Sequence, residues 1–313
     1  MTHPKAVIFG CRGPEIMPDE FRFFSESRPA GFILFSRNCS SPEQIRTLIK
    51  DLRKSINNDK APILIDQEGG RVVRLRKPYW REPPAAQVFA ELATKDINLA
   101  CEALNLNIRL IGDDLRTLGI TVNCLPVLDI SLNDADPIIG DRAFGADAKM
   151  ISILGRVVCE ALLMEGVLPI IKHVPGHGRA KVDSHKALPT VSTDQIELSE
   201  TDFLPFKLLA DMPIAMTAHI IYSAIDRENP ATTSHKVISK IIRKRIGFDG
   251  LLISDDLSMQ ALDGRFADRT QAALAAGCDV VLHCNGDMSE MREIADTASY
   301  LSDKSADRLE RAL

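Results

Sequence analysis

The sequence predicts a (β/α)₈ barrel, in which eight parallel strands alternate with helices and close into one domain. Eight short apolar runs rich in strand-forming residues recur along the 313 residues. Most of these runs are apolar throughout rather than alternating with polar residues, as in parallel strands that are covered on both faces. The segments between the runs are long enough for amphipathic helices, and the chain has ordinary barrel length.

The expected strands are residues 6–9, 31–35, 62–65, 121–127, 168–172, 214–218, 250–254 and 279–283. An open, doubly wound sheet is the alternative, but the GxGxxG signature that usually follows its first strand is missing. We find no linker, low-complexity tract or repeat of fixed period. We therefore expect one domain over residues 1–313.

Helices are expected between these strands. In residues 41–56, Ser41 is a candidate N-cap ahead of Pro42. Residues 150–165 carry apolar side chains every third or fourth position, and residues 87–118 have room for one long helix or two. Glycines follow the helical segments directly before four strands, where a helix C-terminus favours glycine: Gly119, Gly166, Gly247 and Gly277.

The composition excludes several classes of protein. Apolar residues make up 45% of the chain and charged residues 26%, as in a soluble globular protein rather than a disordered, collagenous or coiled-coil one. With 43 acidic and 38 basic residues the net charge is −5, so nothing favours binding to nucleic acid or to a membrane surface. No apolar run approaches the ~18 residues of a membrane span, and residues 6–9 are too short for a signal-peptide core. We expect a cytoplasmic protein.

The seven cysteines are odd in number, and no two have CxxC spacing. We expect these cysteines to be reduced and to act as small buried hydrophobic residues, as in a reducing compartment. We expect no zinc or redox site built from them.

Ionisable side chains recur where the expected strands end, whereas the strand starts are mostly apolar or small. These side chains are Asp66, Asp129, Lys172, His173, His219, Asp255, Asp256 and His283, with Arg142 in the loop that follows Asp129. In a barrel, the loops at the C-terminal ends of the strands carry the functional face. The asymmetry therefore predicts an active site at this end.

The loop after the fifth strand, residues 174–193, is long for a connection without a helix, and such loops are often functional. Gly176 and Gly178 are suited to hinge motion. Asp183 precedes His185 by two residues, so the carboxylate can orient the imidazole and stabilise its protonated form. The alternative for this pair is an ordinary polar surface loop.

Other roles remain open for several residues. Asp255 is a candidate nucleophile or the N-cap of a helix over residues 257–276, and placing Leu251 and Ile253 inside the barrel would point Asp255 into its mouth. Arg74, Arg142 and Lys172 could anchor hydroxyls, an acetyl group or a carboxylate, or form structural ion pairs. Lys172 could also form a Schiff base. His173 and His177 have metal-ligand spacing for a helix, but Pro175 and Gly176 lie between them, so we expect no metal site.

The motifs KHVPGHGRAKVDSH (172–185) and ISDDLSM (253–259) resemble glycoside hydrolase family 3. The similarity is greatest to the single-domain bacterial β-N-acetylglucosaminidases of cell-wall recycling. GFILFSRN (31–38), IDQEGGRVVRL (65–75), GDRAFG (140–145) and TAHIIY (217–222) extend the match over nearly the whole chain. Val174 departs from the phenylalanine common in KHFPGHG.

The resemblance implies a barrel without the second domain of larger relatives, and a retaining exo-β-N-acetylglucosaminidase that needs neither metal nor organic cofactor. It implies Asp255 as nucleophile and His185 as general acid/base, paired with Asp183. Sugar contacts would come from Asp66, Arg74, Arg142, Lys172 and His173. The implied substrate is a GlcNAc–anhydro-N-acetylmuramic acid fragment of peptidoglycan, with or without its peptide.

Three alternatives remain. One is a family 3 glycosidase or glycoside phosphorylase of another sugar specificity. A class I aldolase that uses Lys172 and a non-catalytic sugar-binding protein are the others.

Overall fold

The computed structural model describes residues 3–132 and 135–313, and within them eight parallel strands close into a barrel. In chain order the barrel strands are β1 (Lys5–Gly10), β2 (Pro29–Leu34), β3 (Ile63–Ile65), β4 (Val122–Asn123), β5 (Leu168–Val174), β7 (Ile214–Thr217), β9 (Leu251–Asp256) and β10 (Val280–His283). The first strand pairs with both β2 and β10, which closes the sheet. Each of the eight expected runs contributes one strand, so the predicted fold class is confirmed.

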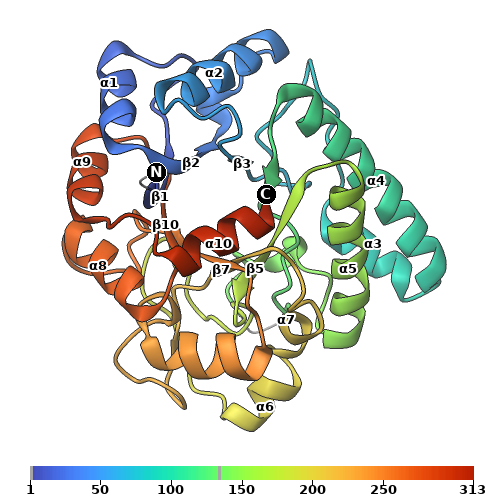
Figure 1. The fold of residues 1–313 in the computed structure, drawn as a ribbon. Coiled ribbons are helices and arrows are strands. Elements are labelled where there is room, and N and C mark those ends of the chain that lie inside the picture. Colours follow the sequence, from blue (N-terminus) through green and yellow to red (C-terminus); the bar gives the residue numbers. More distant parts are fainter. Residues whose placement is uncertain (1–2, 133–134) are drawn as a thin grey trace.

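Helices surround the barrel (Figure 1). They are α1 (Pro18–Ser27), α2 (Pro42–Ser55), α3 (Ala86–Ala93), α4 (Ile97–Leu118), α5 (Ala148–Met164), α6 (Gln195–Glu200), α7 (Leu204–Leu208), α8 (Phe266–Ala276), α9 (Met288–Thr297), α10 (Asp303–Ala312) and the π-helix η4 (Val237–Ile246). Short 3₁₀ turns are η1 (Ser36–Asn38), η2 (Gly140–Arg142) and η3 (Ala231–Thr233). No helix in the described ranges is long and apolar enough to cross a bilayer.

Of the predicted helix boundaries, the start at Ser41 is confirmed and the start at residue 257 is wrong. Ser41 caps α2, because its hydroxyl accepts a hydrogen bond from the Gln44 N–H. Residues 87–118 form two helices, since the Asp96 carboxylate caps the start of α4. The helix expected over 257–276 begins only at Phe266, because residues 257–262 form turns and Gly264 has a φ of +87°.

The glycines at the helix ends have the left-handed backbone that was expected of them. Gly119 follows α4 with a φ of 87°, and Gly277 follows α8 with a φ of 119°. Residues with a Cβ rarely adopt this conformation, whereas glycine does so without steric cost. Each glycine turns the chain from a helix directly into the next strand.

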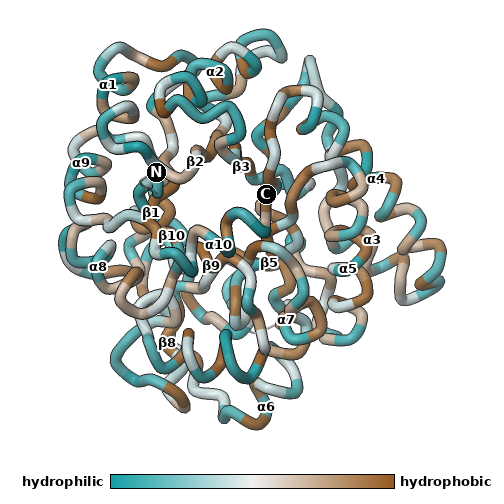
Figure 2. The backbone as a smooth tube through the Cα atoms, in the orientation of Figure 1, coloured by the Kyte–Doolittle hydropathy of each residue, from teal (hydrophilic) through white to brown (hydrophobic). Residues whose placement is uncertain are grey.

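One apolar cluster fills the barrel interior and another lies between the strands and the helices. Leu251 and Ile253 belong to the interior cluster, whereas Leu252 belongs to the outer one. At the N-terminal ends of the strands, Leu309 and Leu313 lie against interior residues, and α10 runs across the barrel (Figures 1 and 2). The opposite end is left for a site.

The long connection after β5 has no helix before α6, as predicted. It contains the short strand β6 (Thr190–Val191), which pairs in parallel with β8 (Ile221–Tyr222). This pairing ties the end of the β5 loop to the loop that follows β7. The seven cysteines are free thiols, five of them buried, which agrees with their expected role as small core residues.

Candidate active site

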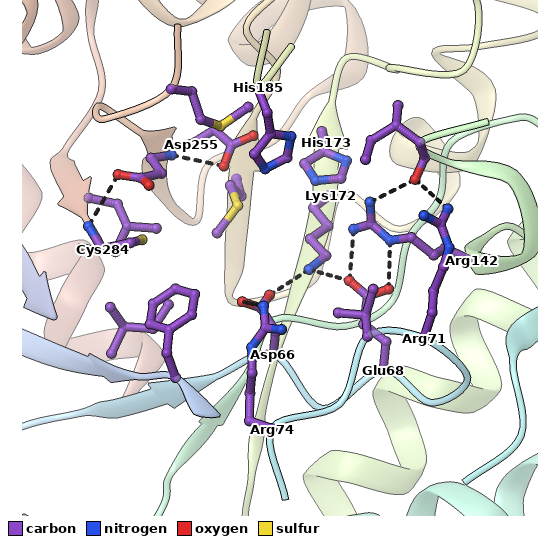
Figure 3. Close-up of a pocket in the computed structure, with 18 residues that line it drawn as sticks. Asp66, Glu68, Arg71, Arg74, Arg142, Lys172, His173, His185, Asp255 and Cys284 are labelled. Carbon is purple, nitrogen blue, oxygen red and sulfur yellow. Dashed lines mark hydrogen bonds and ion pairs between the residues drawn. The ribbon is translucent and has the colours of Figure 1, made fainter. Parts of the chain in front are cut away.

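A cavity of about 250 Å³ lies at the C-terminal ends of the strands (Figure 3). Seven of the eight predicted site residues line it: Asp66, Arg74, Arg142, Lys172, His173, His185 and Asp255. Asp183 is bonded to His185 beside the cavity. The structure therefore brings together residues that are up to 189 positions apart in the chain, from Asp66 to Asp255.

The floor of the cavity is a network of buried and half-buried charges (Figure 3). The Lys172 ammonium lies 2.9 Å from an Asp66 oxygen and 2.7 Å from a Glu68 oxygen. Arg142 donates two hydrogen bonds of 2.8 Å to the Glu68 carboxylate, and Arg74 lies 3.1 Å from Asp66. Glu68 was missed in the sequence, although it lies inside the DQEGGR motif.

These charges fix one another's protonation state. Burial raises the pKa of both carboxyl groups, but the cations more than offset it, holding the pKa of Asp66 below its usual range and lowering that of Glu68 to about 2. The same carboxylates hold the pKa of Lys172 above its usual value, although burial acts the other way. A Schiff-base lysine needs a neutral amine, so this arrangement argues against the aldolase alternative.

Glu68→Gln is expected to flatten the dependence of stability on acid pH. A carboxyl group whose pKa falls on folding stabilises the protein above its unfolded pKa, and this contribution is lost as pH falls through the folded value. For Glu68 the window lies between 4.5 and about 2. The wild-type Tm, followed by circular dichroism, should therefore fall more steeply across this window than that of the variant. Glu82→Gln, which changes an exposed carboxylate, should follow the wild type; parallel curves for Glu68→Gln and wild type would contradict the expectation.

Buried Asp129 organises the two histidines that follow β5. One of its oxygens lies 2.7 Å from His173 Nδ1, and the other accepts the backbone N–H groups of His173 and His177. A carboxylate at Nδ1 fixes the proton there and sets the orientation of the ring. His173 therefore presents a fixed imidazole to the cavity.

Asp255 is the second-last residue of β9 and faces the cavity, on the same side of the strand as Leu251 and Ile253. One carboxylate oxygen accepts the Asp256 N–H at 2.8 Å. Burial raises the pKa of Asp255, but the nearby His173 ring and this N–H are among the groups that outweigh it, so the pKa lies below its usual range. Asp255 is therefore a half-buried, ionised carboxylate that faces the cavity, as a nucleophile requires.

Asp256 has a different environment from Asp255. One of its oxygens accepts the N–H groups of Ser258 and Cys284, at 3.0 and 3.1 Å, and the other accepts the Ser258 hydroxyl. His219, one of the strand-end residues, lies 3.0 Å from the Asp256 carbonyl oxygen. Asp256 thus holds the turn after β9 rather than capping a helix there.

The predicted pairing of Asp183 with His185 is present at the mouth of the cavity. The His185 N–H and ring Nδ1 both lie 2.9 Å from the same Asp183 oxygen. Burial raises the pKa of Asp183, but these bonds outweigh it, and the pKa lies below its usual range. Figure 3 shows the His185 ring above the cavity, between Asp255 and His173.

The two glycines expected to act as hinges lie in the buried base of the loop. The Tyr222 hydroxyl donates to the Gly176 carbonyl. A Cβ on Gly178 would come within 1.8 Å of the Ile130 carbonyl oxygen. Both glycines thus permit close backbone packing, whereas residues 181–183 and 185–187 are at least partly exposed. Motion of the exposed part stays a prediction.

The sequence is similar to those of known glycoside hydrolases. The profile described as the glycosyl hydrolase family 3 N terminal domain matches residues 19–312. A "Beta-hexosaminidase" of Methylococcus capsulatus is 37% identical over 282 residues, which cover 89% of this chain and 82% of that protein. One of Bordetella avium is 33% identical over 286 residues, covering 90% and 81%.

Solved structures show the same similarity. NagZ from Neisseria gonorrhoeae, in complex with N-trifluoroacetyl-D-glucosamine, superposes with a TM-score of 0.91 at 29% identity and covers 99% of this chain and 90% of its own. A family 3 β-N-acetylglucosaminidase from Paenibacillus sp. gives 0.88 at 30% identity. This chain spans 60% of the length of that larger protein.

Proposed function

This chain belongs to glycosyl hydrolase family 3 and is a glycoside hydrolase of the β-hexosaminidase type, and from that premise we propose that it is a retaining exo-β-N-acetylglucosaminidase. Residues 1–313 would form one catalytic domain. The proposal rests on one observation: Asp255, an ionised carboxylate, and His185, whose ring is bonded to Asp183, line the same cavity.

In the first step an Asp255 oxygen attacks the anomeric carbon, and the bond from that carbon to the glycosidic oxygen breaks. The leaving oxygen takes a proton from Nε2 of protonated His185. Because Nδ1 lies 2.9 Å from the Asp183 oxygen, Nε2 is the nitrogen left for this transfer. The product is a covalent glycosyl ester on Asp255, and the neutral imidazole of His185 remains.

In the second step His185 Nε2 accepts a proton from water as the water oxygen attacks the anomeric carbon. The bond between that carbon and the Asp255 oxygen breaks in the same step, which returns the Asp255 carboxylate. Two inversions at the same carbon give net retention of configuration. Asp183, kept ionised, stabilises the imidazolium that is formed again.

The charged floor of the cavity supports sugar binding. Lys172, Arg74 and Asp66 offer charged donors and acceptors to hydroxyl groups, and His173 presents a fixed ring beside Asp255. Arg142 also lines the cavity, with Glu68 holding its guanidinium. We propose that the natural substrate is a GlcNAc–anhydro-N-acetylmuramic acid fragment of peptidoglycan, cleaved in the cytoplasm during cell-wall recycling and without a cofactor.

Aryl β-GlcNAc glycosides should be hydrolysed with a kcat/KM at least about tenfold above that of the matched β-glucosides, because the 2-acetamido group offers contacts that a hydroxyl lacks. The measurement is release of the aryl alcohol from the two substrates under the same conditions. Equal or better turnover of the glucoside would overturn the N-acetylglucosaminidase assignment. Product analysis with added phosphate distinguishes hydrolysis, which yields free sugar, from phosphorolysis, which yields a sugar phosphate.

A further inference from the structure

Ser184 differs from its neighbours in the exposed part of the β5 loop. In residues 181–187 it is the one buried residue, 2% exposed, and it lies between the two members of the Asp183–His185 pair. A small polar side chain gains little from burial in an apolar setting unless it is hydrogen-bonded. The partners of Ser184 therefore indicate why it is buried.

Ser184 is bonded on two sides. Its hydroxyl lies 3.0 Å from Nε2 of His177, in the buried base of the same loop. Its carbonyl accepts the Ala261 N–H at 3.1 Å, from the turn that follows β9 and the Asp255–Asp256 pair. Ser184 thus joins the part of the loop that carries the acid/base to both the loop base and the nucleophile's turn.

His177 is itself firmly held. It is 3% exposed, and its backbone N–H donates to Asp129 at 2.6 Å. Burial lowers the pKa of its ring to about 4, with His173 acting in the same direction, so the ring is neutral near pH 7. Nδ1 of His177 has no hydrogen-bond partner within the described part of the chain. The tautomer with its proton on Nε2 is therefore favoured, because that N–H can donate to the Ser184 hydroxyl.

We propose that Ser184 is a positioning residue, whose bonds to His177 and Ala261 form a latch that holds the Asp183–His185 pair over Asp255. The inference rests on the proposed function. Because Asp183 fixes the His185 ring by a bond within the loop, the ring moves with the loop rather than independently of it. Opening the loop breaks the latch, and re-forming the latch returns Nε2 of His185 to the cavity.

The same network connects the latch to the sugar site. Asp129 orients His173, which lines the cavity, and also anchors the backbone of His177, which holds Ser184. The latch therefore has a fixed base on the substrate side. The buried Asp129 carboxylate therefore stabilises both the position of the loop and the orientation of His173 in the cavity.

The test is Ser184→Ala, with Val182→Ala as the control in the exposed part of the same loop. For substrates with poor leaving groups, kcat/KM should fall about tenfold, as expected for one lost hydrogen bond. For a dinitrophenyl β-GlcNAc glycoside, which needs no protonation in the first step, kcat/KM should change little. Val182→Ala should match the wild type on both substrates.

A double-mutant cycle separates positioning from general structural support. In a His185→Ala background, Ser184→Ala should cause no further loss on a 4-methylumbelliferyl glycoside, because its effect passes through the His185 ring. An equal fractional loss with and without His185, or full activity of Ser184→Ala, would overturn the latch. If Ser184→Ala does not fold, His177→Asn breaks the same contact from the other side and takes its place. Inactivity of the wild type on all GlcNAc glycosides would instead overturn the proposed function.

Discussion

Asp255→Asn is expected to lower kcat/KM for β-GlcNAc glycosides by about 10⁴-fold or more, as removal of a covalent nucleophile does in other enzymes. The variant keeps the size of the side chain and an oxygen that can accept the Asp256 N–H, so the fold should be retained. What is lost is the negative charge that the site maintains on this group. Initial rates and thermal unfolding of the same preparation measure the two effects separately.

Asp256→Asn is the matched control for this prediction. Its side chain accepts hydrogen bonds from the turn after β9 and from Cys284, so the change should lower the free energy of unfolding by about 1–3 kcal/mol and with it the Tm. Substantial activity should remain. A mechanism-based fluorosugar should form its ester on Asp255, located by peptide mass mapping. An ester on Asp256, or full activity of Asp255→Asn, would contradict the assignment.

The barrel was predictable because its signals are local and strong. A parallel strand covered on both faces must be apolar along its length, and a helix that turns directly into the next strand favours glycine at its end, as at Gly119 and Gly277. The break between α3 and α4 was harder, because Asp96 is one polar residue within a segment that fits either reading. The helix expected over residues 257–276 begins only at Phe266, because residues 257–262 form turns and Gly264 has a φ of +87°. The Cys284 N–H, far along the chain, bonds to Asp256 where those turns begin.

The site was predictable as a set of strand-end residues, but not in its internal pairing. The Glu68 carboxylate contacts Lys172 and Arg142, which come from β5 and from the η2 turn, far along the chain. The sequence does not show these partners. It does offer one signal, because Glu68 follows the strand-end Asp66 by two residues, and in extended backbone two such side chains lie on the same side.

The contacts of Ser184 could not be predicted from the sequence for a related reason. Its partners, His177 and Ala261, come from two different parts of the chain and meet only when the β5 and β9 loops are folded against each other. In the sequence it is an unremarkable serine between two residues with obvious chemistry. Local spacing predicts pairs such as Asp183 and His185, whereas contacts between loops require the fold.

His185→Ala is expected to lower kcat/KM by about 10²- to 10⁴-fold for substrates with poor leaving groups, the usual range for loss of a general acid. The loss should shrink as the leaving group improves, because a dinitrophenolate departs without a proton. Asp183→Asn should lower kcat/KM less than His185→Ala does, with the same dependence on the leaving group, because the imidazole remains but loses its carboxylate partner. The measurement is a plot of log kcat/KM against leaving-group pKa for each variant. An equal loss at every leaving group would mean that His185 binds or positions the sugar instead, and would remove the acid/base step from the mechanism while leaving Asp255 in place.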